Sequence, residues 1–398
     1  MSTTPNASVI HGDCIETMNA MPPESVDAIV TDPPYGLGFM GRKWDALPPS
    51  LEWAEACYRV LKPGGHIAAF GGTRTWHRLA VAIEDAGFEM RDSLAWLYGS
   101  GFPKSHDVGK AIDKLAGAER EVVGAGKYAA RGRRTDNAVY GQATESSGEV
   151  ITAPATPEAK QWAGWGTALK PGHEPVVLAR KPLAERTVAR NVLAHGTGAI
   201  NIDACRIDAT GRPLRESRSE ASVSTFGDGL NGSKAVGSTD QGRWPANVLL
   251  DQHAAAWVDE QSGVTKGRTG MTQHSSANRI YGEFKPTEQS LVSGGQADEG
   301  GASRFFYTAK APKRERPSYT TEDGQTVQHS TVKPLAIMRW LLRLVTPPGG
   351  TVLDPFAGSG ATVEAAIIEG FSPIGIELEA EYLPLIQHRI DRQGGDES

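Results

Sequence analysis

The strongest constraint on the fold is a repeated alternation of short apolar runs and helix-like segments in the first hundred residues. Apolar runs at 8–13, 26–31, 66–70 and 93–98 predict buried strands, and the stretches between them carry apolar residues at helical spacing. Strands that alternate with helices form parallel sheets with helices on both faces. We therefore predict an α/β protein with a doubly wound sheet.

Composition bounds the class of protein. The 398 residues are 39% hydrophobic and 22% charged, and the three cysteines lie far apart without zinc-ligand spacing. No apolar run reaches the ~18 residues of a membrane span, and the first residues lack the pattern of a secretory signal. We expect a cytoplasmic, metal-free protein without a membrane partner.

The stretch Thr31-Asp32-Pro33-Pro34-Tyr35 follows one of the predicted strands. Two prolines cannot continue a sheet ladder, so the chain leaves the strand directly after Asp32. A carboxylate, the Pro33 carbonyl and an aromatic ring then lie at the carboxyl edge of the sheet, where ligands of α/β proteins bind. This set suits a planar group with an NH₂, such as a nucleobase turned out of its helix. A strand-ending turn in which Tyr35 only packs is the alternative.

A second pattern occurs near the other end of the chain. The apolar run 351–354 leads into a turn with Gly358 and Gly360, a helix follows, and Glu377 ends the next predicted strand. This order predicts a nucleoside-containing cofactor, with its ribose hydrogen-bonded to the acid. Val363 replaces the third glycine of the dinucleotide pattern, which favours a mononucleoside such as S-adenosylmethionine.

Taken together, these two motifs resemble those of the β class of amino-group DNA methyltransferases, which act on N6 of adenine or N4 of cytosine. The resemblance rests on Asp32-Pro33-Pro34-Tyr35 followed, late in the chain, by Phe356-Ala357-Gly358-Ser359-Gly360. His329-Ser330-Thr331-Val332-Lys333-Pro334 is similar to the family's His-Pro-Thr-x-Lys-Pro element, with Ser330 in place of the usual proline. The likeness covers roughly 8–100, 174–180 and 304–392, and the large insertions look like those of phage and prophage members.

The resemblance implies a seven-stranded sheet with one reversed strand, the strands starting near 351, 373, 8, 27, 66, 93 and 174. It implies a catalytic half over 1–99, a basic insertion over 100–173, a core strand over 174–182, a partly irregular target-recognition insertion over 183–303, and a core strand, basic segment and cofactor half over 304–398. The catalytic residues would be Asp32, Pro33, Pro34 and Tyr35. The residues that bind S-adenosylmethionine would be Asp13, Lys333, Asp354, Pro355, Phe356, Gly358, Gly360 and Glu377.

Positive charge gathers in two segments of a chain whose net charge is −6. Residues 100–200 hold 14 Lys and Arg against 10 Asp and Glu, a balance of +4, and residues 310–340 hold 6 against 3, a balance of +3. Such segments suit a polyanion such as double-stranded DNA, although solvated surfaces are the plainer explanation of charge alone. The residues we expect to contact DNA are Arg42, Lys43, Lys310, Lys313, Arg314 and Arg316.

The expected reaction is methylation of adenine N6 in DNA by base flipping and direct transfer, as in adenine-specific enzymes of restriction-modification systems. The alternatives are methylation of cytosine N4, methylation of a protein amide or an RNA base, and a DNA-binding protein with an inactive core. Methylation of cytosine C5 is excluded, because no cysteine follows a proline. The recognition sequence, a homodimeric state and a partner endonuclease stay open.

Overall fold

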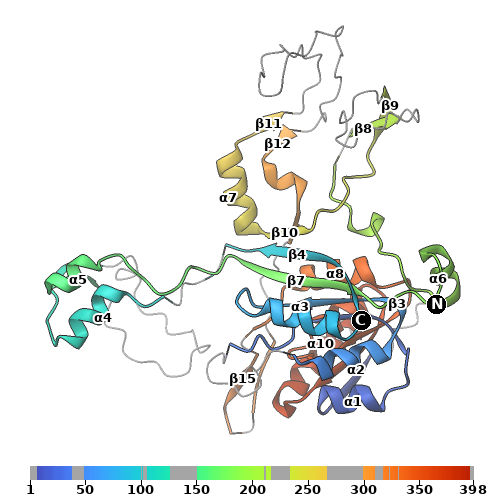
Figure 1. Ribbon diagram of the computed structural model, residues 1–398, viewed down its shortest axis with the longest axis horizontal. Helices are drawn as coiled ribbons and strands as arrows, with labels where there is room; N and C mark the ends of the chain where they lie inside the picture. Colours follow the sequence, from blue (N-terminus) through green and yellow to red (C-terminus); the bar gives the residue numbers. More distant parts are fainter. Residues whose placement is uncertain are drawn as a thin grey trace.

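A nine-stranded mixed sheet forms the centre of the computed structural model (Figure 1). The structure describes residues 7–37, 49–99, 101, 105–125, 150–209, 212–216, 234–266, 299–309, 317–321, 323–329 and 331–394. From one edge of the sheet to the other, the strands are β1 (Ser8–His11), β17 (Ser372–Glu377), β16 (Thr351–Asp354), β2 (Val26–Thr31), β3 (Leu61–Phe70), β7 (His173–Arg180), β4 (Glu89–Leu97), β10 (Val248–Asp251) and β13 (Tyr307–Ala309).

One strand of this sheet is reversed. All neighbouring strands pair in parallel except at β7, which runs antiparallel to both β3 and β4. The seven predicted strands are all present, and the predicted mixed α/β fold is confirmed. The sheet is nevertheless wider than expected, because β10 and β13 continue it beyond β4.

Helices cover both faces of the sheet. Alternate residues of β2 point to opposite faces, as the pleat of a strand requires. Ala28 and Val30 belong to the buried cluster that includes α8, whereas Ile29 belongs to the cluster that includes α1, α2 and α3. The layers consist of α1 (Cys14–Ala20), α2 (Leu51–Val60) and α3 (Trp76–Asp85) on one face, and α8 (Leu335–Val345) and α9 (Ala361–Ile368) on the other, with α10 (Leu383–Gly394) packed against α9 and β1.

Two insertions leave this core. Figure 1 shows α4 and α5 displaced to one side of the sheet, and α7 with β11 and β12 rising beyond β10. The first insertion, between β4 and β7, contains α4 (Val108–Leu115), β5 (Val122–Ala125), β6 (Val150–Thr152) and α5 (Pro157–Gln161). The second, between β7 and β13, contains α6 (Val188–His195), η3 (Asp203–Cys205), β8 (Arg212–Glu216), β9 (Lys234–Thr239), β10, α7 (Gln252–Ser262), β11 (Thr265–Lys266), β12 (Glu299–Gly300) and η4 (Ala302–Phe305). The chain after β13 adds β14 (Ser318–Thr320), β15 (Thr326–Gln328) and η5 (Ala380–Tyr382).

The second insertion is more regular than its polar sequence indicates. The part of 183–309 that the structure describes contains two α-helices, α6 and α7, and two strands of the central sheet, β10 and β13. Helix α6 begins at the N-cap Thr187 and ends at the left-handed Gly196, and its one buried residue is Asn191. The Asn191 amide donates to the carbonyls of Pro63 and Thr197, each at 2.8 Å. The helix is specified by its caps and by the buried polar side chain of Asn191. The spacing of apolar residues in the sequence therefore does not predict it.

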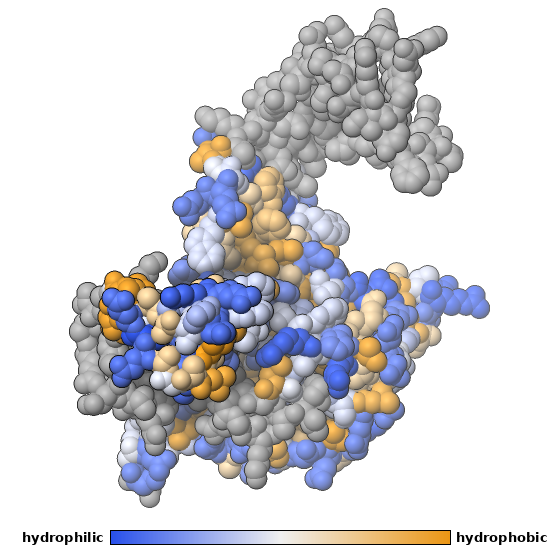
Figure 2. Space-filling view, turned by 60° about the vertical axis from the view of Figure 1, so that its left-hand side comes forward, coloured by the Kyte–Doolittle hydropathy of each residue, from blue (hydrophilic) through white to orange (hydrophobic). Residues whose placement is uncertain are grey.

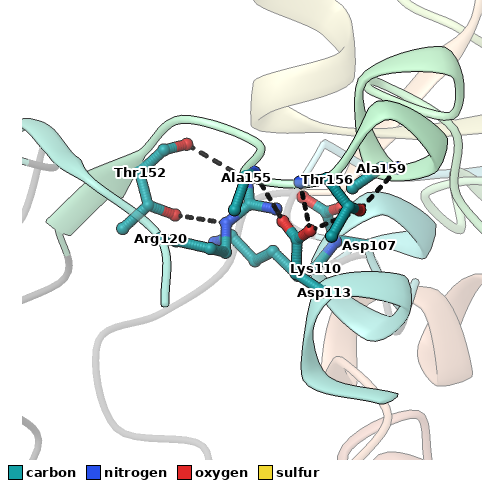
Figure 3. A network of polar contacts seen from close by, with 8 residues as sticks. All are labelled: Asp107, Lys110, Asp113, Arg120, Thr152, Ala155, Thr156 and Ala159. Carbon is teal, nitrogen blue, oxygen red and sulfur yellow. Dashed lines mark hydrogen bonds and ion pairs between the residues drawn. The ribbon is translucent and has the colours of Figure 1, made fainter. Parts of the chain in front are cut away.

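The α4–α5 unit is organised around one buried carboxylate, Asp113 (Figure 3). The side chain is fully buried, and it accepts hydrogen bonds from the amides of Ala155 and Thr156, from the Thr156 hydroxyl and from the Arg120 guanidinium. Burial alone would raise the pKa of Asp113, but these donors lower it to about 2. Arg120 in turn donates to Thr152, so the ion pair ties α4 to the chain before α5.

Hydrophilic and hydrophobic residues are intermingled over the face of the molecule that is turned to the reader in Figure 2. Within the described residues, no helix combines the length and the apolar character needed to cross a membrane.

We predict that Asp113→Ala loosens the α4–α5 unit without disturbing the central sheet, because several buried donors lose one shared acceptor. Hydrogen–deuterium exchange should accelerate in 108–121 and 150–162 and stay unchanged in β2. Asp107→Ala is the matched control, since it removes only the N-cap bond to the Lys110 amide. Equal protection of these segments in wild type and Asp113→Ala would contradict the assigned role.

Candidate active site

The two sequence patterns meet at one edge of the sheet. Strands β2 and β16 are parallel neighbours, with Ala28 opposite Val352 and Ile29 opposite Leu353. The Thr31 hydroxyl at the end of β2 donates to Asp354 Oδ1 at the end of β16, at 2.7 Å. Parallel pairing therefore places the Asp32-Pro33-Pro34-Tyr35 stretch beside the glycine turn, although they are more than 300 residues apart in the sequence.

Four side chains form a polar cluster just beyond β2. The Lys333 ammonium lies 2.6 Å from Asp32 Oδ2, 3.3 Å from Glu174 Oε2 and 3.1 Å from the Tyr35 hydroxyl. The Tyr35 hydroxyl lies 2.9 Å from Asp32 Oδ1 and 3.2 Å from Glu174 Oε2. One cation and one phenol thus lie between two carboxylates.

Burial and charge set the protonation of this cluster. Burial raises the pKa of Tyr35 well above its usual value, and the carboxylates of Asp32 and Glu174 raise it further. Burial alone would lower the pKa of Lys333, but the same two carboxylates outweigh it and raise the pKa above its usual value. Tyr35 is therefore a neutral phenol at pH 7 and Lys333 an ammonium.

Glu174 is the member of this cluster that the sequence pattern did not identify. In a parallel strand the residue after the apolar run lies at the ligand edge, and Asp32 follows this rule. Strand β7 runs the other way, so the residue before its apolar run takes that place, and Glu174 precedes Pro175 and Val176. The acidic residue at the start of the reversed strand is the sequence feature that could have identified Glu174. Lys333, which the resemblance placed among the cofactor residues, forms an ion pair with Asp32.

The glycine turn has the backbone that its residues favour. Gly358 and Gly360 have φ of +52° and +82°, in the left-handed region that glycine adopts without strain. A Cβ on Gly358 would lie 3.1 Å from His329 Nε2, and one on Gly360 would lie 3.0 Å from the Ile386 Cα. Any larger residue would fill the space at this turn, from which α9 begins.

Val363, where a dinucleotide pattern has glycine, is accommodated by the neighbouring strand. A Cβ on Gly375 of β17 would lie 2.9 Å from Val363 Cγ2 and 3.2 Å from the Ala357 Cβ. The space for close contact between helix and strand is thus provided by Gly375 of the strand rather than by the helix.

Glu377 ends β17 with its carboxylate turned to the glycine turn. Oε2 accepts from the Gly358 amide at 2.6 Å, and Oε1 accepts from the Glu379 amide at 2.9 Å. Burial raises the pKa of Glu377 to about 7, although both amides lower it. The carboxyl group therefore changes charge near neutral pH.

Asp354 and Asp13 have local structural partners. Burial raises the pKa of Asp354 to about 6, although the hydroxyls of Thr362 and Thr31 and the Phe356 amide donate to it. Asp13 caps α1 by accepting from the Ile15 and Glu16 amides at 2.8 and 3.0 Å. It lies two residues beyond His11, which pairs with Glu377.

Of the remaining residues that the sequence predicted for the site, some lie within the described parts of the structure and some lie outside them. Pro33 is buried, Pro34 is half-buried, and Pro355 is buried beside the half-buried Phe356, whose ring centroid lies 5.9 Å from that of Trp53. The predicted DNA contacts lie outside the described residues: Arg42, Lys43, Lys310, Lys313, Arg314 and Arg316. Within the described ranges, no group of three His, Cys, Asp or Glu side chains could hold a metal ion.

Comparison with known proteins shows the family of this chain. The family model of N6/N4 DNA methylases matches residues 26–388, a range that runs from β2 into α10. The chain belongs to the N6/N4 DNA methylase family. The match includes both the Asp32 cluster and the glycine turn.

Individual relatives match shorter stretches of the chain than the family model does. The chain is similar to the type II methyltransferase M.HpaI of Haemophilus parainfluenzae, at 34% identity over 115 residues, which cover 27% of this chain and 37% of that protein. It is similar to the methylase YubD of Escherichia coli K12, described as putative, at 38% identity over 93 residues, which cover 22% of this chain and 41% of YubD. The matched stretches thus span less than half of either relative. The solved structure of the cytosine-N4-specific PvuII DNA methyltransferase aligns over 98% of this chain and 91% of its own, at 14% identity and a TM-score of 0.43.

We predict that Thr31→Val lowers the free energy of unfolding by about 1–3 kcal/mol, because a buried carboxylate loses a hydrogen bond. The loss should be larger at pH 8 than at pH 5, since Asp354, whose pKa is about 6, is ionised at pH 8 and largely protonated at pH 5. Thr31→Ser keeps the hydroxyl and serves as the control. Urea unfolding at both pH values measures the effect, and equal stability of the Val and Ser variants would show that the bond contributes nothing.

Proposed function

We propose that this chain is an S-adenosylmethionine-dependent DNA methyltransferase that transfers a methyl group to N6 of adenine in double-stranded DNA. The observation that carries the proposal is the hydrogen bond from Thr31 to Asp354, which joins the Asp32 cluster and the glycine turn in one site. Membership of the N6/N4 DNA methylase family supports the same chemistry.

The residues of the cofactor half fit S-adenosylmethionine. Left-handed glycines at 358 and 360 leave these two positions of the turn without side chains, and a buried carboxylate at 377 faces the turn. We assign Glu377 to the ribose hydroxyls and Asp13 to the adenine, with Asp354, Pro355 and Phe356 shaping the pocket. When bound, the cofactor supplies an electrophilic methyl group on a sulfonium.

The catalytic half acts on the amino group. Its nitrogen is a poor nucleophile, because the lone pair is conjugated with the base. Hydrogen bonds from the NH₂ to the Asp32 carboxylate and the Pro33 carbonyl would direct that lone pair toward the methyl group. Tyr35 would stack on the flipped base and offset the few kcal/mol lost on unstacking. Pro33 and Pro34 hold this backbone extended, so the acceptors are preorganised.

The assignment to adenine rests on Asp32, since the resembling family members that methylate cytosine N4 more often have serine there. The test is transfer of a labelled methyl group to unmethylated plasmid DNA, followed by digestion and mass spectrometry of the nucleosides. N6-methyladenine supports the proposal, N4-methylcytosine would move the target to cytosine, and no product with wild-type protein would reject the function.

The biological setting belongs to the same proposal. We place the enzyme in the cytoplasm of a bacterium or an infected host, with a role in DNA modification or restriction-modification. Arg42, Lys43, Lys310, Lys313, Arg314 and Arg316 are proposed to hold the DNA backbone. The likeness to phage and prophage members stays a prediction, and both curated relatives described above come from bacteria.

We predict that Asp32→Ala abolishes methyl transfer and leaves the affinity for S-adenosylmethionine within about twofold of wild type. The substitution removes the acceptor for the target amino group and leaves the glycine turn untouched. Single-turnover assays and calorimetric titration measure the two quantities. Substantial residual transfer by Asp32→Ala would refute the role of this carboxylate.

We predict that cofactor affinity falls about tenfold from pH 8 to pH 6, because the ribose hydroxyls need an ionised Glu377 and its pKa is about 7. Glu377→Gln should bind more weakly and lose this part of the pH dependence. Comparing the two proteins cancels titration of the cofactor itself. Parallel pH profiles in calorimetry would show that Glu377 does not contact the ligand.

A further inference from the structure

The Tyr35 hydroxyl has more partners than one proton can serve. Lys333, an ammonium, donates to it at 3.1 Å, and the acceptors Asp32 Oδ1 and Glu174 Oε2 lie at 2.9 and 3.2 Å. A phenol carries a single proton. At any moment Tyr35 therefore donates to one of the two carboxylates, and the other is within reach of the same proton.

The reaction that Asp32 is proposed to assist must dispose of a proton. An amino nitrogen that gains a methyl group becomes positively charged and loses one N–H proton to return to neutrality. Asp32 is the base nearest to that nitrogen in the proposed function. Once protonated, Asp32 needs an exit for the proton, and its Oδ2 already accepts from Lys333 at 2.6 Å.

We propose that Asp32, Tyr35 and Glu174 form a proton relay that removes this proton during methyl transfer. This inference rests on the proposed function and adds Glu174 as a residue that moves the proton of the same reaction. As the nitrogen lone pair forms the N–C bond, the cofactor S–C bond breaks and its electron pair stays on sulfur. The N–H proton passes to Asp32 Oδ1, leaving its bonding pair on nitrogen. In the same step, Asp32 Oδ1 protonates the Tyr35 oxygen as the original Tyr35 proton passes to Glu174 Oε2.

The placement of Glu174 suits the end of this relay. It stands at the start of β7, where Gly71 donates to the Pro175 carbonyl at 2.9 Å and fixes the strand against β3. Its side chain is 20% exposed, so a proton received on Oε2 can pass to water. Lys333 also contacts Oε2 at 3.3 Å and holds the carboxylate beside the phenol.

The Tyr35 ring is positioned independently of the relay. Its Cβ and Cδ2 lie close to Gly72, where an added Cβ would approach them to 3.2 and 3.1 Å. Tyr35→Phe therefore keeps a ring that can pack and stack, and it removes only the hydroxyl. Glu174→Gln keeps an acceptor oxygen of the same reach, and it removes the ability to take a proton.

The test compares wild type, Tyr35→Phe, Glu174→Gln and the double variant in single-turnover methyl transfer to unmethylated plasmid DNA. Each single variant should slow transfer by about 100-fold, the lower end of the range of general acid–base effects. The double variant should be no more than about threefold slower than either single one, because both changes break the same relay. Multiplied losses in the double variant would overturn the relay.

A proton inventory gives a readout that misplaced side chains would not produce. The wild-type transfer rate should curve when plotted against the deuterium fraction of the solvent, because several protons move in one step. Both single variants should give straight lines. A straight line for the wild type, or unchanged curvature in the variants, would overturn the proposal. Glu158→Gln, an exposed position on α5, controls for loss of one negative charge.

The hydrogen bond can also be detected without any turnover. In protein labelled at the tyrosine Cζ carbon, Tyr35→Phe identifies one of the nine tyrosine resonances in the free enzyme. Glu174→Gln should shift that resonance, and Glu158→Gln should not. An unmoved signal would refute the contact between Tyr35 and Glu174. If wild type transfers methyl groups while these tests fail, the relay alone is wrong; if wild type transfers none, the proposed function itself is rejected.

Discussion

The structure depends on the parallel pairing of β2 with β16, completed by the hydrogen bond between Thr31 and Asp354. These strands come from opposite ends of the chain, and their carboxyl ends must coincide for any site to form between them. The bond lies in the buried layer, where an unsatisfied carboxylate is costly, so it specifies the register as well as adding stability. The Asp32 cluster and the glycine turn become one site through this contact.

The site also depends on the reversed strand β7. Because β7 runs against its neighbours, it brings its first residues to the edge where the parallel strands end. Glu174 thereby faces Asp32 across a single ammonium, that of Lys333. Two carboxylates that share one cation leave a negative charge beside Tyr35, which suits a step in which an amino group becomes positive and then loses a proton.

The parallel core and its two half-sites could be predicted from the sequence, since each follows from an apolar run with a distinctive residue at its end. Asp32, Gly358 and Glu377 all obey that rule, and the structure places them at one sheet edge. The rule fails for a reversed strand, whose residue at the ligand edge precedes the run, and Glu174 was missed for that reason. Helix α6 was missed because its buried residue is polar, and α7 because it buries only two alanines. The added strands β10 and β13 are short and pair with partners far away in the sequence, which local patterns do not encode.

In the proposed function, the Asp32 cluster and the glycine turn act together on an amino group of DNA. Single-molecule sequencing of DNA from cells that express this chain tests it most directly, because it reports the modified base and its position in every sequence context. We predict N6-methyladenine at one recurring sequence in cells with the wild-type chain, and none in cells with Asp32→Ala. Unmodified DNA from wild-type cells, or modification that persists with Asp32→Ala, would contradict it.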